Sequence, residues 1–293
     1  MQKSFLSIAN LSKDELLELL EVASTQRLRV VSKMLRDQHL ALYFEKPSLR
    51  TKASFETGIG ELGGSFSYFS AVDTGKLGER ESVEDLAKTM SEYFSAIIVR
   101  VYSHTALEKF TAAASVPVVN ALSDREHPCQ VLADLLTIRD KLGKLEGFKL
   151  AFLGDGNNVA LSLALAAEIL GFEFILAGPK DYYLKYGQIK QTEDIDAALQ
   201  NADVVYTDTW TSMGDEEEEM RRKKLFLPFQ LNTETLRKAK EGAIVMHCLP
   251  AHREKEITNK VIDSKQSVVF QQAANRLPAQ KALLIKLFSK ATV

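Results

Sequence analysis

Cysteine is scarce in this sequence: Cys129 and Cys248 are its two cysteines among 293 residues. Two cysteines so far apart cannot supply the disulfide framework of a small secreted domain. The N-terminal segment MQKSFLSIANLSKDELLELL lacks the long apolar run of a signal peptide, and no apolar run reaches the ~20 residues that a membrane-spanning helix requires. We therefore expect a cytoplasmic protein that does not span a membrane.

An excess of charge of either sign is also missing. The 37 Lys and Arg residues nearly balance the 39 Asp and Glu residues, which leaves a net charge of −2. This balance argues against nucleic acid or an anionic membrane as the main partner. Hydrophobic residues make up 45% of the chain, which is ordinary for a globular protein, and the length suits about two domains. Any anion site must then be a local cluster of cations.

Strand-like runs alternate with helix-like segments along the chain. The expected strands are HLALYF, SFSYFS, AIIVRV, VPVVNAL, FKLAFLG, FEFILAGP, DVVYTDTW, EGAIVMHCLP and SVVFQQA. The expected helices include KDELLELLEVASTQRL, HPCQVLADLLTIRDKLG, LSLALAAEILG and PAQKALLIKLF. This alternation predicts an α/β fold of two domains with parallel sheets covered by helices on both faces. The run DEEEEMRRKK is typical of a solvated helix face or a mobile loop.

Polar and reactive residues recur directly after the expected strands. They lie in EKPSLRT, Arg100, HPCQ, DGNN, Asp208, HCLP and Asn275-Arg276. In open parallel sheets, ligands bind at the carboxyl ends of the strands. The sequence therefore predicts that the functional site lies at these ends.

The segment FEKPSLRT combines several features of an anion site. Backbone N–H groups at a helix N-terminus are unpaired and carry partial positive charge, so an anion binds well there. Ser48 and Thr51 add hydroxyl donors, and Arg50 can bind two phosphate oxygens at once. The segment is not a P-loop, because GxxxxGK[ST] is absent. A phosphate site and a plain N-cap at Ser48 beside a surface cation are both open at this point.

The segment LGDGNN follows an expected strand and opens a helix, yet it lacks the GxGxxG pattern of a dinucleotide turn. The amides of Asn157 and Asn158 suit a zwitterion, because an amide donates to a carboxylate and accepts from an amine. The alternative is an Asx-turn that caps the helix. The cysteines and histidines of HPCQ and HCLP lack the spacing of zinc ligands, so we expect no metal. A cysteine nucleophile is a further alternative.

Taken together, these segments resemble the aspartate/ornithine carbamoyltransferase family, and its ornithine-using members most closely. The matching stretches are FEKPSLRT, LGERES, Arg100, HPCQVLADLLTI, LGDGNN, DTWTSMG, HCLPAHR and NRLPAQKALL. They occur in the family's order and cover nearly the whole chain. The combination of HPCQ, SMG and HCLP is highly specific, since an aspartate-using relative would be expected to lack both SMG and the HCLP cysteine.

The resemblance implies the transfer of a carbamoyl group from carbamoyl phosphate to the δ-amine of L-ornithine, which yields L-citrulline and phosphate without a metal or organic cofactor. It implies two doubly wound domains joined by long helices. Residues 1–140 would bind carbamoyl phosphate, with the C-terminal helix 277–293 packing back on them, and residues 148–276 would bind ornithine. It also implies trimers or multiples of trimers, in which the LGERES loop at 77–82 of a neighbouring subunit contacts the phosphate. Arginine biosynthesis and arginine breakdown both fit.

The resemblance further implies a role for each motif residue. Carbamoyl phosphate contacts fall on Ser48, Leu49, Arg50, Thr51, Arg100, His127, Gln130, Cys248, Leu249 and Arg276. Ornithine contacts fall on Asn158, Asp208, Ser212 and Met213, the last through its backbone. The expected catalytic residues are Arg100, His127, Asp208 and Cys248. Fixed cations and donors would stabilise the charge that develops on the carbonyl oxygen and the departing phosphate, and Asp208, Cys248 or the phosphate itself would help to deprotonate the δ-ammonium.

Some positions depart from the family's usual pattern. Leu49 stands where threonine is usual and Lys52 where arginine is usual, which removes one hydroxyl and the bidentate fork of a guanidinium. Glu254 replaces the glycine of HRG, and QAANR lacks the acid that commonly precedes Asn275. Because leucine at position 49 is also found in relatives that use N-acylated ornithine, a carbamoyltransferase for that amine or for putrescine is an alternative. A non-catalytic binding homologue is another.

Leu49→Thr adds a hydroxyl donor to the phosphate segment, so we expect it to bind carbamoyl phosphate more tightly. A hydrogen bond to a charged acceptor contributes about 1.5 kcal/mol, which corresponds to a roughly tenfold lower KM for carbamoyl phosphate. Steady-state kinetics at saturating ornithine measure this KM, and Leu49→Val is a control of similar shape without the hydroxyl. An unchanged KM in Leu49→Thr would contradict a weak phosphate contact at this position.

Overall fold

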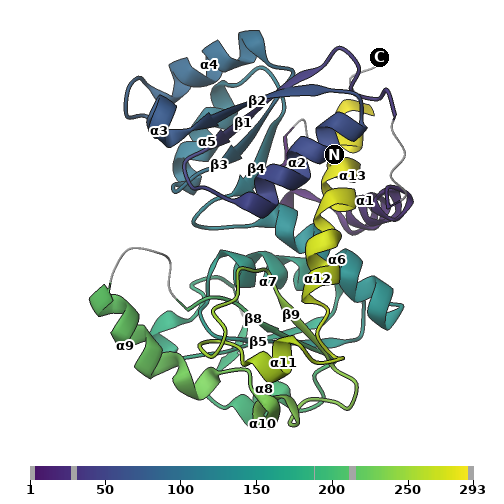
Figure 1. The fold of residues 1–293 in the computed structure, drawn as a ribbon, viewed down its shortest axis with the longest axis vertical. Helices are drawn as coiled ribbons and strands as arrows, with labels where there is room; N and C mark the ends of the chain where they lie inside the picture. The colour runs from purple at the N-terminus through teal and green to yellow at the C-terminus, as the bar shows by residue number, and fades with distance from the viewer. Residues whose placement is uncertain (1–3, 28–31, 188, 211–215, 290–293) are drawn as a thin grey trace. The chain divides into compact units, whose positions relative to one another are not determined.

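The computed structural model describes residues 4–27, 32–187, 189–210 and 216–289. The chain divides into two compact units. Unit 1 comprises Met1–Leu136 and Ala274–Val293, and unit 2 comprises Thr137–Ala273. Each unit is built around one sheet in which all paired strands run parallel (Figure 1). The expected α/β class with two parallel-sheet domains is therefore confirmed.

The sheet of unit 1 has four strands in the order β2-β1-β3-β4. Their bounds are His39–Phe44 for β1, Ser65–Ser70 for β2, Ala96–Arg100 for β3 and Val118–Leu122 for β4. The strand that follows β1 in sequence, β2, is added on one side of the central pair, and the strand that follows β3, β4, is added on the other. The crevice at the carboxyl ends of β1 and β3 is the place where a doubly wound sheet binds its ligand.

Helices cover both faces of this sheet. They are α1 Lys13–Thr25, α2 Leu49–Glu61, α3 Ala71–Thr74, α4 Val83–Tyr93, α5 His104–Ala113, α6 Pro128–Leu142 and α13 Arg276–Ser289, with a 3-10 turn at Ile8–Asn10. Figure 1 shows α2, α13 and α1 on the opposite side of the sheet from α5. Because α13 packs on α1 and α2, the expectation that the C-terminal helix returns to the N-terminal domain is confirmed.

The sheet of unit 2 has five strands in the order β7-β6-β5-β8-β9. Their bounds are Lys149–Leu153 for β5, Glu173–Ala177 for β6, Lys190–Thr192 for β7, Val204–Thr207 for β8 and Ile244–His247 for β9. The winding direction reverses between β5 and β8. The second predicted ligand crevice therefore lies at the carboxyl ends of β5 and β8.

The helices of unit 2 are mostly short. They are α7 Asn158–Leu170, α8 Ile195–Leu199, α9 Glu216–Phe226, α10 Thr233–Leu236, α11 Asn259–Ile262 and α12 Val269–Ala274, with 3-10 turns at Lys180–Tyr182 and Leu227–Phe229. The long helix α7 is buried on nearly every side, which explains why its sequence is apolar all round rather than along one stripe. The chain passes between the units within α6 and at the end of α12.

The strand expected at SVVFQQA is wrong. Ser267 forms an isolated bridge with Val245, and the N–H of Val268 donates to the Val245 carbonyl at 3.0 Å. The chain then turns into α12 at Val269. Val268 and Val269, which suggested a strand, thus lie where a short pairing with the edge strand β9 passes into helix α12. The strand β7 and the helix α5 are elements that the sequence did not predict.

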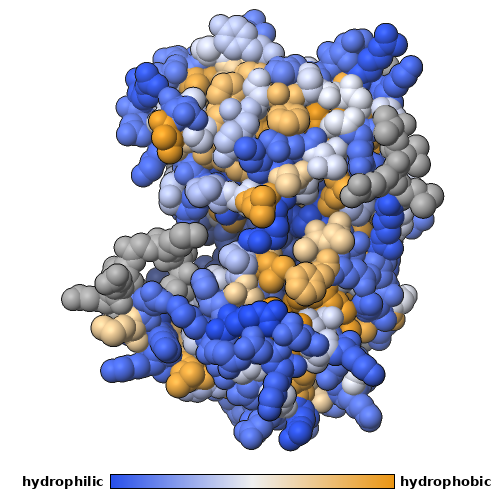
Figure 2. Space-filling model, in the orientation of Figure 1, coloured by the Kyte–Doolittle hydropathy of each residue, from blue (hydrophilic) through white to orange (hydrophobic). Residues whose placement is uncertain are grey.

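The face shown in Figure 2 is largely hydrophilic, with small groups of hydrophobic residues between the hydrophilic ones. Among the described residues, the most exposed large hydrophobic side chains are Val72 at 95%, Leu49 at 79% and Tyr93 at 70%. Leu49 is the first residue of α2, so an apolar side chain is exposed at the start of this helix. Within the described ranges, every helix is too short or too polar to cross a bilayer.

Gly178 follows β6 and touches the backbone that leaves β5. A Cβ added at Gly178 would lie 2.0 Å from the carbonyl oxygen of Gly154. Since backbone cannot yield as a flexible side chain can, we expect Gly178→Ala to lower the free energy of unfolding by roughly 3 kcal/mol. Urea denaturation measures the loss.

Gly60→Ala is the control for this substitution. An added Cβ at Gly60 would meet nothing within 4 Å, and alanine is favoured over glycine inside a helix by about 1 kcal/mol. This variant should therefore be slightly more stable than the parent protein. Equal stability of Gly178→Ala and the parent would contradict the close approach of the two backbone segments.

Candidate functional site

Each unit gathers polar side chains at the crevice where its sheet reverses winding. In unit 1 they follow β1 and β3 and are joined by the starts of α6 and α13. In unit 2 they follow β5, β8 and β9. We call these groups the arginine cluster and the Asp208 cluster. The arginine cluster comprises Ser48, Arg50, Thr51, Arg100, His127, Gln130 and Arg276, and the Asp208 cluster comprises Asn157, Asp208 and Cys248.

The start of α2 is built by Ser48. This residue is extended and its Oγ accepts a hydrogen bond from the Thr51 N–H at 3.3 Å, which is the usual geometry of an N-cap. The same hydroxyl donates to Thr51 Oγ1 at 3.1 Å. Ser48 is half-buried and Thr51 is 1% exposed. Ser48 is therefore the N-cap of α2. Whether this helix start can also bind an anion depends on the arginines of the cluster.

Arg276 connects three helices of unit 1. Its guanidinium donates to Thr51 Oγ1 at 3.1 Å and to Gln130 Oε1. Gln130 in turn donates through Nε2 to the buried Asp134 at 2.8 Å. Arg276 is 3% exposed, so its charge is held away from bulk water. In such a shielded place a fixed cation attracts an anion more strongly than it would in water.

His127 lies among the positive charges of the cluster. It is 6% exposed and directly precedes α6. Burial lowers the pKa of His127 well below its usual range, and the nearby charges of Arg276, Arg100 and Arg50 lower it further. The imidazole is therefore neutral at physiological pH. A neutral imidazole has one N–H group, which can donate a hydrogen bond to a substrate oxygen.

Arg100 ends strand β3 beside the end of β1. Its Nε donates to the Lys46 carbonyl at 3.2 Å, and the carboxylate of Glu45 accepts from Tyr102 N–H and Leu77 N–H at 2.7 Å each. Glu45, which follows β1, thus holds the segment after β3 and the loop after α3 in place. The local sequence gives no signal for this role of Glu45, because its partners lie on segments that are distant in sequence.

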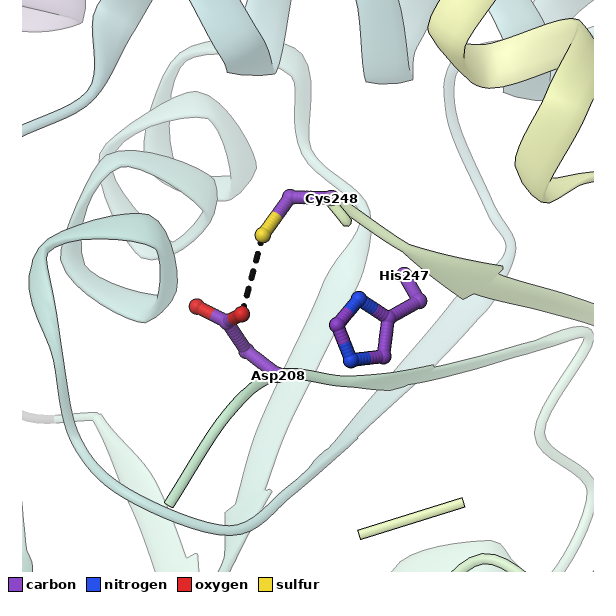
Figure 3. Close-up of side chains that lie close together, drawn as sticks. All are labelled: Asp208, His247 and Cys248. Carbon is purple, nitrogen blue, oxygen red and sulfur yellow. Dashed lines mark hydrogen bonds between the residues drawn. The ribbon is translucent and has the colours of Figure 1, made fainter. Parts of the chain in front are cut away.

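The Asp208 cluster is held together by direct hydrogen bonds. The Cys248 thiol donates to Asp208 Oδ1 at 2.9 Å, and Figure 3 shows the sulfur directed at the carboxylate. The amide of Asn157 donates to Asp208 Oδ2 at 2.7 Å. Asp208 is 8% exposed. The carboxylate is therefore aimed from β8 toward the residues that follow β5 and β9.

His247 lies beside this cluster, and its ring is fully engaged. Nδ1 accepts from the Leu249 N–H at 2.9 Å, so Nε2 carries the proton and donates to the buried Glu256 at 3.1 Å. Ligand atoms of Asp208, His247 and Cys248 lie within 4.8 Å of one another. A metal ion there would have to displace one of the two hydrogen bonds of His247, so the donor set does not favour a metal.

The turn after β9 depends on the same histidine. Leu249 has φ +58, a left-handed conformation that costs a leucine on the order of 1 kcal/mol. Its N–H is held by His247, whose own N–H donates to Gln272 at 3.0 Å. These contacts hold Cys248 and the Leu249 carbonyl at the carboxyl edge of the sheet.

The two asparagines of LGDGNN have different positions. Asn157 is the N-cap of α7, where its Oδ1 accepts from the N–H groups of Val159 and Ala160 at 3.0 Å each. The alternative of a capping Asx residue is therefore correct for Asn157, which also reaches Asp208. Asn158 is the first residue of α7 and is half-buried. The expected ornithine contacts Ser212 and Met213 lie outside the described residues.

The run DEEEEMRRKK, expected to be a solvated helix face or a mobile loop, lies in helix α9 from Glu216 onward, and one of its arginines turns inward. Arg222 of α9 is half-buried, with its guanidinium over the ring of Tyr182 at 4.5 Å and in an ion pair with Asp155. Burial raises the pKa of Asp155, although Arg222 acts in the opposite direction. Nothing in a mixed-charge run distinguishes the one arginine that turns inward.

Cys129 and Cys248 are both free thiols with different surroundings. Cys129 is buried and donates to the Asn120 carbonyl at 3.3 Å. Burial raises the pKa of Cys129 to about 12, so it is a neutral structural thiol and not a nucleophile. Cys248 is the cysteine that lies at the crevice.

Family models match both halves of the chain. Residues 3–140 match the carbamoyl-P binding domain of aspartate/ornithine carbamoyltransferase, and residues 146–287 match its Asp/Orn binding domain. The chain belongs to the aspartate/ornithine carbamoyltransferase family.

Similar proteins extend this match over the full length. An ornithine carbamoyltransferase of Methanospirillum hungatei is 45% identical over 303 residues, which cover 99% of this chain and 100% of that protein. One from Archaeoglobus fulgidus is 44% identical over 302 residues, 98% of each. The solved ornithine carbamoyltransferase of Pyrococcus furiosus is 41% identical with a TM-score of 0.92 and covers 96% of this chain and 95% of its own.

His127→Gln tests the neutral, buried imidazole. A histidine with a depressed pKa in the folded state binds its proton only after unfolding, so its contribution to stability is present above pH 6.5 and is lost as the pH falls below it. The loss approaches about 1.4 kcal/mol per pH unit. We expect unfolding free energies from urea denaturation to fall less between pH 6.5 and 5.5 in His127→Gln than in the parent, by roughly 1 kcal/mol. Parallel pH profiles would contradict a neutral His127.

Proposed function

We propose that this chain transfers the carbamoyl group of carbamoyl phosphate to the δ-amine of L-ornithine, giving L-citrulline and phosphate. The observation that carries the proposal is the full-length similarity to ornithine carbamoyltransferases, combined with two complementary clusters. One presents hydroxyls and cations, of which Arg276 is buried, and the other presents a carboxylate, a thiol and an amide. Such groups suit a phosphate donor and an amino-acid acceptor.

The two substrates are assigned to two domains. Residues 1–140 with the C-terminal helix 277–293 bind carbamoyl phosphate, and residues 148–276 bind ornithine. The descriptions of the two matching family domains support this division. The arginine cluster then belongs to the first domain and the Asp208 cluster to the second.

The start of α2 holds the phosphate. Ser48, Arg50 and Thr51 donate hydrogen bonds to its oxygens, and the backbone N–H of Leu49 takes the place of the usual hydroxyl. Lys52 adds charge without a bidentate fork. These fixed donors stabilise the negative charge that grows on the phosphate as it departs, which lowers the barrier of the chemical step.

The remaining members of the arginine cluster bind the carbamoyl end. Arg100 and neutral His127 donate to the carbonyl oxygen, together with Thr51. Gln130 binds the carbamoyl amide, and Arg276 bridges the carbonyl and phosphate regions. When the amine attacks, the carbonyl oxygen becomes an oxyanion, and donors already aimed at it need no reorganisation.

The Asp208 cluster binds ornithine. Asp208 accepts from the α-ammonium, and Asn158, Ser212 and the backbone of Met213 bind the α-carboxylate and α-amine. The thiol of Cys248 and the carbonyl of Leu249 face the δ-amine.

Before attack the δ-ammonium loses a proton, and Asp208, Cys248 or the phosphate contributes to this deprotonation. The neutral amine then bonds to the carbamoyl carbon, and the bond from that carbon to the phosphate oxygen breaks. Fixing both substrates adds a large proximity effect.

A free α-amine fits this site better than the alternative acceptors. Putrescine has no α-carboxylate, and an acylated ornithine has no α-ammonium to pair with Asp208. The carboxylate of Asp208 is nearly buried and already accepts from neutral donors, so a cationic amine is the favourable addition. Carbamoylation of those other amines is therefore the less supported function.

The proposal includes an assembly and a cellular role. We place the protein in the cytoplasm and in amino-acid metabolism, where its reaction fits arginine biosynthesis and equally fits arginine breakdown. It forms trimers or multiples of trimers in which residues 77–82 of one subunit approach the phosphate bound by its neighbour. Arg80 in that loop is exposed and available for such a contact.

A citrulline assay tests the function. Purified protein is incubated with carbamoyl phosphate and, separately, L-ornithine, N-acetylornithine and putrescine, and each carbamoylated product is quantified by mass spectrometry. We expect turnover with ornithine, and a loss of at least a hundredfold in kcat/KM for ornithine in Asp208→Asn, since removing one partner of a charged contact costs roughly 3 kcal/mol. Preferred turnover of another amine would overturn the substrate, and no product with any amine would overturn the enzyme.

A further inference from the structure

A lysine is fully buried between two helices of unit 1. Lys281 of α13 has 0% of its side chain exposed, and its Nζ lies 2.8 Å from Glu61 Oε2 in the last turn of α2. The Glu61 side chain is itself 14% exposed. A lysine is rarely buried to this degree, because removing its charge from water is costly unless a partner compensates.

The helix α2 is shaped to receive this lysine. Gly58 lies three residues before Glu61, on the same face of the helix. A Cβ added at Gly58 would lie 3.2 Å from Lys281 Cγ and 3.5 Å from Leu277 Cδ1. The missing side chain at Gly58 thus forms a slot in which the lysine stem lies before its ammonium meets Glu61.

The contacts between the two helices follow the same order on both. Arg276 meets Thr51 near the start of α2, Leu277 meets Gly58, and Lys281 meets Glu61 at its end. The helices therefore run in the same direction at this contact. A displacement of α13 along α2 would separate the Lys281–Glu61 pair and would withdraw the Arg276 guanidinium from Thr51.

Stability alone does not explain a buried ion pair. Apolar side chains of similar volume usually stabilise an interior as well or better, because they carry no desolvation cost. What an ion pair adds is directionality, since an ammonium and a carboxylate match at one position and apolar surfaces can slide. A pair placed at the far end of the contact from Arg276 can set the register of the whole helix.

We propose that Lys281 and Glu61 are positioning residues that set the register of α13 on α2 and so place Arg276 against Thr51 and the bound phosphate. This inference rests on the proposed function, in which Arg276 bridges the carbonyl and phosphate regions of carbamoyl phosphate. Neither Lys281 nor Glu61 contacts substrate. Their effect appears as tighter binding of the phosphate substrate, and not as a change in ornithine binding.

The double variant Lys281→Met with Glu61→Leu tests the register directly. It replaces both charges by apolar groups, so it avoids the unpaired buried charge that would unfold a single variant. We expect a melting temperature near that of the parent, a roughly tenfold higher KM for carbamoyl phosphate, and a similar rise in the Kd for inorganic phosphate by calorimetry. The KM for ornithine should change less than twofold.

The matched control removes a second ion pair from the same helix. Lys286 of α13 pairs with Glu18 of α1, on a contact that does not involve α2. Lys286→Met with Glu18→Leu removes the same charges, and both KM values should stay within twofold of the parent.

A second variant keeps both charges and changes the slot. Gly58→Ala pushes the lysine stem away from α2 and should raise the KM for carbamoyl phosphate about threefold. Gly60→Ala is its control in the same helix, since nothing lies within 4 Å of the added Cβ, and its KM should match that of the parent.

The outcomes separate the two proposals. If the parent forms citrulline while the double variant and Gly58→Ala keep the parent's KM and phosphate Kd, the positioning role is overturned. A lower kcat with unchanged KM also overturns it, because partial unfolding reduces the amount of active protein without weakening its binding. If the parent forms no citrulline, the proposed function fails. The Kd for phosphate still tests the register in that case.

Discussion

The buried guanidinium of Arg276 is the interaction on which unit 1 depends. A cation at 3% exposure is tolerated only where fixed acceptors surround it, and Thr51 and Gln130 supply them. Meeting these acceptors brings the last helix of the chain onto the helix that follows the first strand. One charge therefore joins the C-terminal helix to the start of α2, where the proposed phosphate site lies.

The arginine cluster contains both charged and neutral hydrogen-bond donors. Burial lowers the pKa of His127, the charges of the nearby arginines lower it further, and the imidazole stays neutral. The cluster therefore combines cations with a neutral hydrogen-bond donor. In unit 2 the central group is a carboxylate and its partners are donors, because Asp208 accepts hydrogen bonds from the Cys248 thiol and the Asn157 amide. Each crevice thus contains one buried charged side chain, Arg276 in unit 1 and Asp208 in unit 2. The signs of these charges suit the anionic donor and the cationic acceptor of the proposed reaction.

Much of this could be predicted from local sequence. The capping serine at position 48, the apolar runs of the strands and the motifs after them indicated the parallel sheets and most members of both clusters, because caps, periodicity and strand ends are properties of short segments. The strand expected at SVVFQQA failed for the same reason: Ser267 and Val268 have the local pattern of a strand, but Val245 offers pairing for only those two residues.

The sequence by itself determined the family, the alternation of elements and the side chains available for chemistry. The tertiary structure alone decided which of them meet. Asn157 caps α7 and also reaches Asp208, which follows a different strand. Arg222 turns from a charged run toward Asp155, and Lys281 finds Glu61 across 220 positions of sequence. These pairings depend on how distant helices pack, and a one-dimensional pattern carries no information about the partner that lies across an interface.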